Sequence, residues 1–165
     1  MEKVSFASMP CSMARTLDIV GEWWSLLIIR DIFIGIRRFN ALRNHLGIAR
    51  NMLQRRLLRL EEGGIIYKKP TSDAHSEYHL TEAGVALYPV LLAFVKWGDD
   101  WLVDEKPPNL FIHDDCGHAV SAEVVCNHCG EVLGAHNVTQ KGGPGMPKSE
   151  ARRLEQLISE VKKAQ

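Results

Sequence analysis

The chain has 165 residues, 45% of them hydrophobic and 24% charged, with 20 basic and 20 acidic side chains and therefore no net charge. This length suits one well-buried domain with an appendage, and the composition excludes a largely disordered chain. The longest uncharged apolar runs, such as "VALYPVLLAFV", are shorter than the roughly 20 residues that span a bilayer, and the N-terminus has no signal-peptide pattern. We therefore expect a cytoplasmic protein with no membrane association.

The zero net charge hides a segregation along the sequence. Residues 37–69 contain nine Lys or Arg and two acids, a local balance of +7, whereas residues 99–131 contain eight acids and one Lys, a balance of −7. A basic block of this kind attracts a polyanion, unless both blocks are solvated faces of a balanced surface.

The first half of the sequence predicts a series of short helices. A helix begins near Cys11, carries apolar residues at helical spacing and ends at Gly21. The next helix, Trp23 to Phe33, is so apolar that most of its circumference should be buried, which places it at the centre of the core. The sequence "RRFNALRNHLG" predicts a third, short helix with Gly47 as its left-handed C-terminal residue.

The sequence "IARNMLQRRLLRLEE", residues 48–62, predicts an amphipathic helix with a basic face. On a helical wheel one arc is apolar and comprises Ala49, Met52, Leu53, Leu57 and Leu60. The opposite side carries Arg50, Asn51, Gln54 and Arg55, whose side chains suit guanine and adenine edges. At the margins, Arg56 and Arg59 would contact phosphates or lie along apolar surface.

Together with the preceding short helix, this segment predicts a helix-turn-helix whose recognition helix covers about residues 49–62. The first helix of such a motif crosses the DNA backbone, so Arg38 and Asn40 join the expected contacts. Two strands, "IIYKKP" and "EYHLT", follow and are joined by the turn-forming run "TSDAHS". This hairpin, about residues 65–80, predicts a wing that contacts the DNA backbone or minor groove through Lys68, Lys69, Ser72 and His75. Each lysine alone could equally be a solvated strand end.

A long helix capped by Thr81 should cover residues 82–103, with an interruption at Pro89. Its apolar residues nearly encircle it, and one small core cannot cover them all. The sequence "KPPN" then separates a winged-helix domain, residues 1–106, from an extension, residues 107–165. In the extension we expect a short β-ribbon at 110–140, a linker at 141–148 and a helix at 149–163; no internal repeat is evident. The expected fold class is mainly α with a small β-hairpin wing.

Cysteines in the extension show part of a zinc-ligand pattern. Cys126 and Cys129 form a CxxC followed by glycine, the turn that wraps a tetrahedral metal, and Cys116 precedes them. His118 is the expected fourth zinc ligand, with His113, His128 and His136 as alternatives. A vestigial ribbon with free thiols is the competing interpretation.

Over Cys11 to about Leu102 the sequence resembles the HxlR family of winged-helix transcription factors, within the MarR-like superfamily. The matching elements are the cysteine that opens the first helix, Gly21 with Trp24, "RRFNAL", "ML", "LEEGG", "EYHLTEAG" and "WG". The resemblance implies a homodimer on a palindromic DNA operator, with the terminal helices forming the interface. The chain departs from the family pattern at Glu22 and Trp23, where a Gly-Lys-Trp run is common, and at Ala49, where a serine often opens the recognition helix.

In some members of the family the cysteine at the position of Cys11 senses oxidants or electrophiles. The start of a helix also favours a thiolate, so Cys11 is a candidate redox sensor; the alternative is an inert apolar residue near the dimer interface. A small-molecule effector is a further expectation.

We therefore expect a dimeric, sequence-specific DNA-binding regulator of transcription. The alternative is a metal-binding adaptor whose acidic Cys/His ribbon recruits another protein. An enzyme is not predicted, because the sequence has no Gly-rich phosphate loop, no nucleophile elbow and no carboxylate pair flanked by a histidine.

Overall fold

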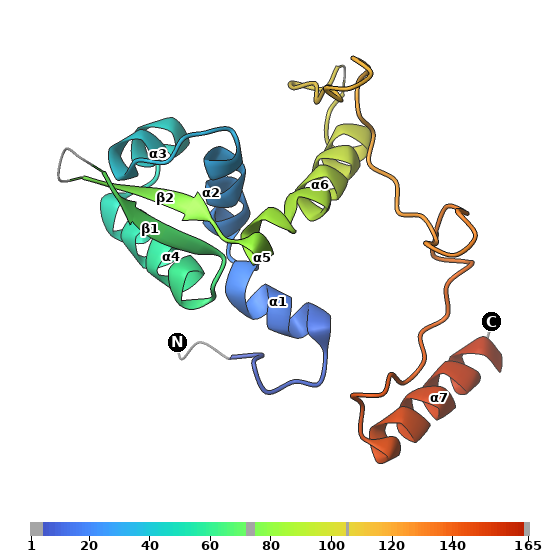
Figure 1. Ribbon diagram of the computed structural model, residues 1–165. Helices are drawn as coiled ribbons and strands as arrows, with labels where there is room; N and C mark the ends of the chain where they lie inside the picture. The colour runs from blue at the N-terminus through green and yellow to red at the C-terminus, as the bar shows by residue number, and fades with distance from the viewer. Residues whose placement is uncertain (1–4, 72–74, 105, 164–165) are drawn as a thin grey trace. The chain divides into compact units, whose positions relative to one another are not determined.

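The computed structural model describes residues 5–71, 75–104 and 106–163 (Figure 1). By its internal contacts the chain divides into two compact units, one made mainly of Ser12–Ala122 and the other mainly of Glu123–Gln165. The elements are α1 (Ser12–Val20), α2 (Trp23–Phe33), α3 (Phe39–Leu46), α4 (Arg50–Glu62), β1 (Ile66–Pro70), β2 (Ser76–Leu80), α5 (Glu82–Val85), α6 (Tyr88–Trp101) and α7 (Lys148–Lys163).

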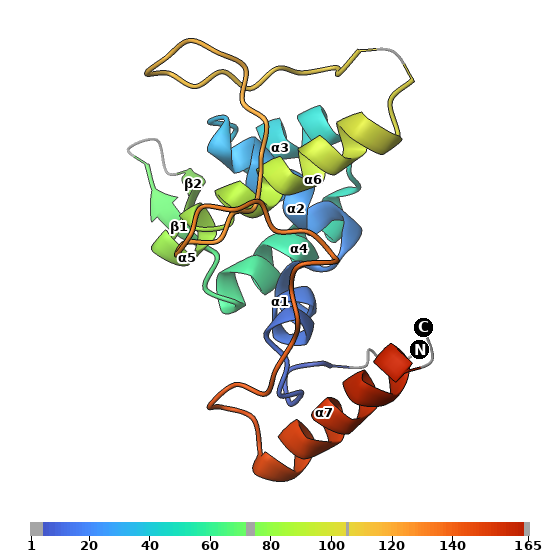
Figure 2. The same ribbon diagram turned by 90° about the vertical axis from the view of Figure 1, so that its right-hand side faces the viewer.

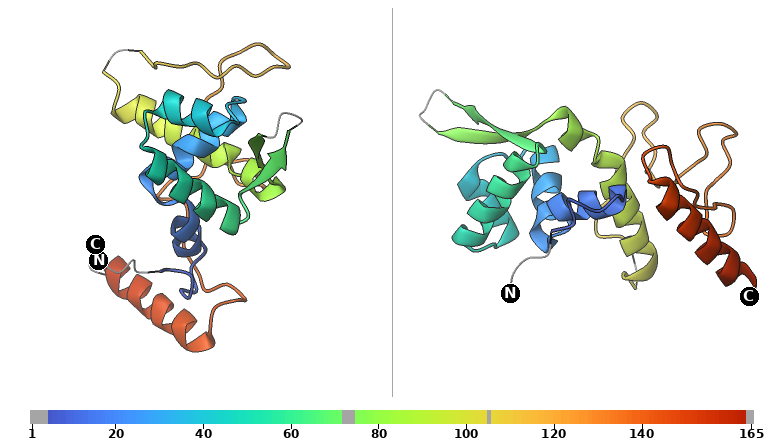
Figure 3. Two further views of the ribbon diagram at one scale, coloured as in Figure 1. Left: turned by 90° about the vertical axis from the view of Figure 1, so that its left-hand side faces the viewer. Right: turned by 90° about the horizontal axis from the view of Figure 1, so that it is seen from below.

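Helix α2 is the centre of the first unit, as its apolar sequence predicted. In Figures 1 and 3, α3 and α4 lie on one side of it and α6 lies on the other, and Figure 2 shows α6 crossing in front of it. Ile28, Ile29 and Ile32 are fully or almost fully buried. The expectation that most of its circumference is buried is wrong at the N-terminal end, where the Trp23 side chain is 91% exposed. The rest of the core is made of Val20, Leu42, Ile48, Leu53, Leu57, Leu60, Ile65, Ile66 and Tyr78.

The predicted helix-turn-helix is present in α3 and α4. Gly47 ends α3 in the left-handed region, with φ 64° and ψ 20°, which only glycine adopts at little cost. The chain then enters α4 through Ala49, which is extended and provides no side-chain cap. Ala49 is exposed rather than part of the apolar arc, because it lies just before the helix begins.

Strands β1 and β2 pair antiparallel, with Lys68 opposite Tyr78 and Tyr67 opposite His79. The hairpin is joined to the start of α3, because the Tyr78 amide donates to the Arg37 carbonyl oxygen at 2.8 Å and Arg38 forms an isolated bridge with Glu77. Figure 3 shows the strands extending alongside α3 and α4 as an arm. This is the arrangement of a winged helix-turn-helix.

The long helix expected after Thr81 is divided into α5 and α6. Thr81 caps α5, since its hydroxyl oxygen accepts from the Gly84 amide at 3.1 Å. The interruption precedes Pro89, which then occupies the first turn of α6, where its missing N–H costs nothing. Helix α6 has no buried residue, and several of its large apolar side chains are exposed, namely Val90, Phe94, Trp97 and Trp101.

The region after residue 106 contains less β-structure than expected. Its described residues form two isolated bridges, Ile112 with Ala119 and Val125 with Val132, and no strand. The first compact unit extends beyond residue 106 to Ala122, and Phe111 shares a cavity with α2 and α6; a separate domain ending at residue 106 stays a prediction. Within the described ranges, no helix has the length and apolarity to cross a membrane.

Candidate nucleic-acid interface

The N-terminal half of α4 presents a polar face to solvent. Arg50, Asn51, Gln54 and Arg55 are all exposed. Leu53, on the opposite face, is completely buried, and Leu57 and Leu60 continue this buried face along the helix. The division into a polar and an apolar side predicted for this helix is therefore confirmed, and its hydrogen-bonding side chains are free to approach a ligand from solvent.

Helix α3 orients part of this face. The Arg50 guanidinium lies 5.6 Å from the centroid of the Phe39 ring, within the range of a cation–π interaction. Because Phe39 is the first residue of α3, this contact places the beginnings of the two helices next to each other. Arg55 stays close to its own helix, with Nη2 at 3.6 Å from the Met52 sulfur.

The C-terminal half of α4 uses its arginines differently. Arg56 Nη2 lies 2.9 Å from Glu22 Oε2, and the Arg56 side chain is only 12% exposed. Arg59 Nη2 lies 2.7 Å from an oxygen of Asp18, which is almost fully buried. Both side chains therefore attach α4 to neighbouring parts of the same unit, and the phosphate contacts expected of Arg56 and Arg59 stay predictions.

Asp18 and Glu22 are the structural residues that sequence reasoning missed here. Asp18 Oδ1 also accepts the Phe6 amide at 3.0 Å, so this carboxylate joins α4, α1 and the N-terminal segment. Glu22 was recognised as a departure from the family pattern, but its role as the partner of Arg56 was not. The sequence separation of 41 between Asp18 and Arg59 explains why no local sequence signal could pair them.

Most of the other residues that we expect to contact DNA lie on the wing. Lys68 Nζ lies 5.6 Å from the Tyr78 ring centroid, and Lys69 and His75 are exposed. The hairpin turn is closed by the Thr71 amide and hydroxyl, which both donate to the His75 carbonyl oxygen. Ser72 lies outside the described residues.

Arg38 and Asn40 flank the first residue of α3. Asn40 is exposed, whereas Arg38 Nε lies 3.3 Å from Glu77 Oε1 with about half of its side chain still exposed. The structure thus brings α3, α4 and the wing together through Arg38–Glu77 and Arg50–Phe39. Glu77, a further residue missed at the sequence level, holds Arg38 against the wing.

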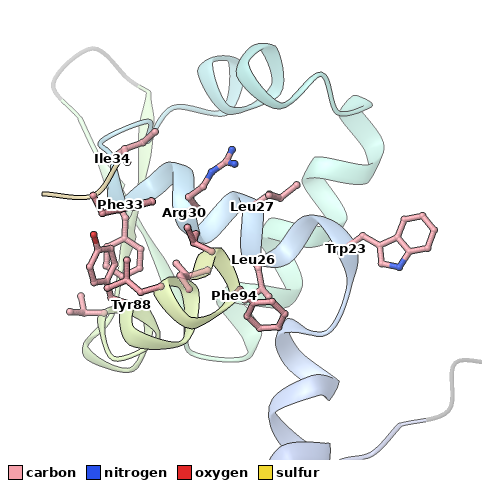
Figure 4. Close-up of a pocket in the computed structure, with 13 residues that line it drawn as sticks. Trp23, Leu26, Leu27, Arg30, Phe33, Ile34, Tyr88 and Phe94 are labelled. Atoms are coloured by element: carbon pink, nitrogen blue, oxygen red, sulfur yellow. The ribbon is translucent and has the colours of Figure 1, made fainter. Parts of the chain in front are cut away.

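A cavity of about 690 Å³ lies between α2 and α6 in the first unit (Figure 4). Its lining is apolar except for Arg30, whose guanidinium donates to the buried carboxylate of Asp31 at 2.7 Å. The size is within the range of about 300–1,000 Å³ for small-molecule sites. The lining residues are Trp23, Leu26, Leu27, Arg30, Phe33, Ile34, Val85, Tyr88, Leu91, Leu92, Phe94, Val95 and Phe111.

The four cysteines are free thiols. Cys11 is exposed and directly precedes α1, where the sequence placed it. In the extension, the backbone amides of Cys129 and His128 donate to the Cys126 sulfur and hold the pKa of that thiol below its usual range. In the part of the chain that the structure describes, no group of three or more His, Cys, Asp or Glu side chains is assembled to hold a metal ion.

Comparison with known proteins agrees with the winged helix-turn-helix fold. The model of the HxlR-like helix-turn-helix family matches residues 19–106. The chain belongs to this family and is a transcriptional regulator with a helix-turn-helix domain. Over 137 residues it is 43% identical to the uncharacterized HTH-type transcriptional regulator Rv3095 of Mycobacterium tuberculosis (strain ATCC 25618 / H37Rv). The matched region covers 81% of this chain and 87% of that protein.

Solved structures resemble the chain over different lengths. The crystal structure of PA1607, a proposed transcription factor, is 34% identical with a TM-score of 0.78, and the match covers 85% of this chain and all of that one. The redox regulator HypR in its oxidized form is 32% identical with a TM-score of 0.51, covering 55% of this chain and 96% of that one. The likeness to PA1607 therefore extends well beyond the winged helix, whereas the likeness to HypR covers little more than half of the chain.

Proposed function

We propose that the protein is a homodimeric, sequence-specific DNA-binding regulator whose helix α4 enters the major groove. The observation that carries this proposal is the exposed face of Arg50, Asn51, Gln54 and Arg55, set on a helix whose opposite face is buried. Arginine pairs with guanine through two hydrogen bonds, and Asn and Gln do the same with adenine. The wing lysines and His75 would contact the backbone or minor groove beside it.

The exposed apolar side chains of α1 and α6 support the dimer. Met13 and Leu17 on α1 and Phe94, Trp97 and Trp101 on α6 are each at least 48% exposed. A monomer that left so many large apolar groups in water would lose the stabilisation that burial provides, and exposed apolar patches of this kind mark interaction surfaces. A second copy of the chain would bury these helices and place two α4 helices on one duplex.

Selection of bound sequences from random duplexes tests this function. For the purified full-length protein at low salt, we expect an inverted repeat whose half-sites are spaced by about one helical turn, roughly 34 Å, or a multiple of it. Recovery of no common sequence would contradict specific DNA binding and favour the adaptor function. A common sequence without two-fold symmetry would contradict the homodimer.

We further propose that Cys11 makes the regulator responsive to oxidants or electrophiles. Its thiol is exposed at the start of α1, and the similar protein HypR is a redox regulator. The labelling rate of Cys11 by a thiol reagent should exceed that of an unfolded peptide thiol, with Cys11→Ser as the control for the other cysteines. A rate no faster than the peptide's would contradict the sensor.

The cavity between α2 and α6 is proposed as the site of an uncharged apolar effector. The guanidinium of Arg30 already pairs with the buried Asp31 carboxylate, and the other described lining residues are uncharged, which favours an uncharged ligand. A neutral fluorescent probe such as N-phenyl-1-naphthylamine should bind the full-length protein with enhanced emission. Leu92→Trp, which fills the cavity, should abolish this enhancement, and the same emission from both proteins would exclude the site.

A further inference from the structure

A fully buried carboxylate, Asp31, lies in helix α2, with both of its oxygens paired. Arg30 donates to Oδ1 from Nε at 3.0 Å and from Nη2 at 2.7 Å. On the other oxygen, His45 Nδ1 lies 2.7 Å from Oδ2. Because a carboxylate only accepts hydrogen bonds, Nδ1 is the ring nitrogen of His45 that carries the proton. We call Arg30, Asp31 and His45 the Asp31 network.

One end of the Asp31 network lies at the cavity between α2 and α6. Among the lining residues that the structure describes, Arg30 alone is charged, and its side chain is 41% exposed. In Figure 4 its guanidinium points away from Tyr88 and Phe94 of α6. A ligand in the cavity would replace water beside Arg30, and a guanidinium with less water depends more on its carboxylate. Occupation of the cavity therefore acts on Asp31 through Arg30.

The other end of the Asp31 network lies in the helix-turn-helix. His45 belongs to the last turn of α3, two residues before Gly47, where the chain turns towards α4. The buried carboxylate of α2 thus holds the end of α3. The start of α3 is in turn joined to the start of α4 by the contact of Phe39 with Arg50. A shift of His45 relative to α2 therefore moves the helix on which the placement of α4 depends.

The two ends of the network cannot respond independently. If either Arg30 or His45 moved away, a buried carboxylate oxygen would lose its partner, which is unfavourable in the interior. Hydrogen bonds to the two oxygens of one carboxylate also influence each other, because they share its charge. A change in the hydration or position of Arg30 therefore changes the bond between Asp31 and His45.

We propose that the Asp31 network transmits occupation of the cavity to the helix-turn-helix, so that a ligand between α2 and α6 changes the affinity for DNA. This inference rests on the proposed function, since it needs both a ligand in the cavity and DNA on α4. His45 is then a positioning residue, which acts through Asp31 and needs no contact with the ligand. Because coupling is reciprocal, bound DNA must change the affinity for the ligand by the same factor.

The test compares the affinity of the full-length protein for its selected operator with and without saturating N-phenyl-1-naphthylamine. The ratio of the two affinities is the coupling factor, and for the wild type we expect a change of at least about 5-fold. His45→Leu removes the donor to Asp31 at a side chain that is 49% exposed, so the protein should still bind the probe while its coupling factor falls to about 1.

Two further variants separate this role from a general effect of substitution. His45→Asn places an amide nitrogen near the position of Nδ1 and should retain most of the coupling, because it can still donate to Asp31. His136→Leu makes the same exchange as His45→Leu at another exposed histidine, outside the cavity and the helix-turn-helix, and should retain all of it.

Nitrogen-15 NMR of the histidine rings gives a second readout that needs no variant of the Asp31 network. Addition of the probe to the wild-type protein should shift the Nδ1 resonance of His45, because its bond to Asp31 changes. The ring resonances of His136, assigned with His136→Leu, should stay in place. An unchanged His45 resonance at saturating probe would overturn transmission through Asp31.

The outcomes distinguish this inference from the function on which it rests. A wild-type protein that does not bind the probe would overturn both the effector site and the coupling. Probe binding without a change in operator affinity would overturn the coupling alone. Equal coupling factors in His45→Leu and the wild type would overturn the role of the Asp31 network. If selection recovers no operator, DNA recognition fails and the coupling fails with it.

Discussion

The two halves of α4 use the same residue type for different purposes. In the first half, Arg50 and Arg55 have no carboxylate partner among the ion pairs of the described residues and project into solvent; in the second half, Arg56 and Arg59 pair with Glu22 and Asp18. The difference arises from the neighbouring elements, since α1 and the start of α2 supply acids only to the second half. An arginine-rich helix can thus be attached to its own fold at one end and be available to a ligand at the other.

The dependence of DNA affinity on salt should be the largest effect. If the exposed half of α4 and the wing together contact about 6–10 phosphates per dimer, affinity should fall by about 10³–10⁵-fold between 50 and 200 mM salt. Replacing Lys68 and Lys69 with Ala should lower the slope of log affinity against log salt without changing the preferred sequence. Titrations at several salt concentrations measure both. If the double variant shows the same slope as the wild type, the wing lysines do not contact the DNA.

Loss of the dimer should be the next largest effect. Trp97→Glu places a charge on the exposed apolar side of α6 and should give a monomer in sedimentation experiments. Because a dimer holds two recognition helices on one duplex, operator affinity should then fall by about 10²–10⁴-fold. Val138→Glu, at a comparably exposed apolar residue outside α1 and α6, is the matched control and should change neither property. A dimeric Trp97→Glu protein would show that α6 is not the interface.

Removing the partner of Arg59 tests the attached half of α4. Asp18→Ala leaves Arg59 and the Phe6 amide without this carboxylate and should lower the free energy of unfolding by about 1–3 kcal/mol. Denaturant titration followed by circular dichroism measures the change. Asp100→Ala removes the exposed pair with Lys96 and should cost less than about 0.5 kcal/mol. Equal losses in the two variants would contradict a structural role for Asp18.

Adding a side-chain cap at the start of α4 should give the smallest effect. Ala49 has the extended backbone of a helix cap, with φ −61° and ψ 138°, but no side chain that can accept a hydrogen bond. Ala49→Ser should raise the free energy of unfolding by about 0.5–2 kcal/mol. The same titration measures it, and a destabilised Ala49→Ser protein would show that the serine cannot reach the free amides.

Local patterns predicted much of this fold. The apolar run of α2, Gly47, the strands around "TSDAHS" and the break before Pro89 all follow from short-range chemistry, and each was confirmed. The exposed polar face of α4 was also predicted by a short-range pattern, the helical spacing of its apolar residues. Long-range ion pairs were beyond such reasoning, because nothing in the sequence near Arg59 indicates Asp18.

The extension was predicted less well for a different reason. Its expected zinc ligands, Cys116, His118, Cys126 and Cys129, stay a prediction. Ribbon formation was overestimated because short apolar runs with turns resemble strands, although the described residues form only two isolated bridges there.

The base preference of the Arg55→Ala protein tests most directly whether the exposed half of α4 recognises DNA. Affinities for the selected operator and for operators with single base changes would be compared with those of Arg152→Ala, which removes an exposed arginine from α7. We expect Arg55→Ala to lose about 1–3 kcal/mol of discrimination, about 5- to 150-fold, at one symmetric base pair, and Arg152→Ala to lose none. An Arg55→Ala protein with the affinity and base preference of the wild type at every position would contradict recognition by this face.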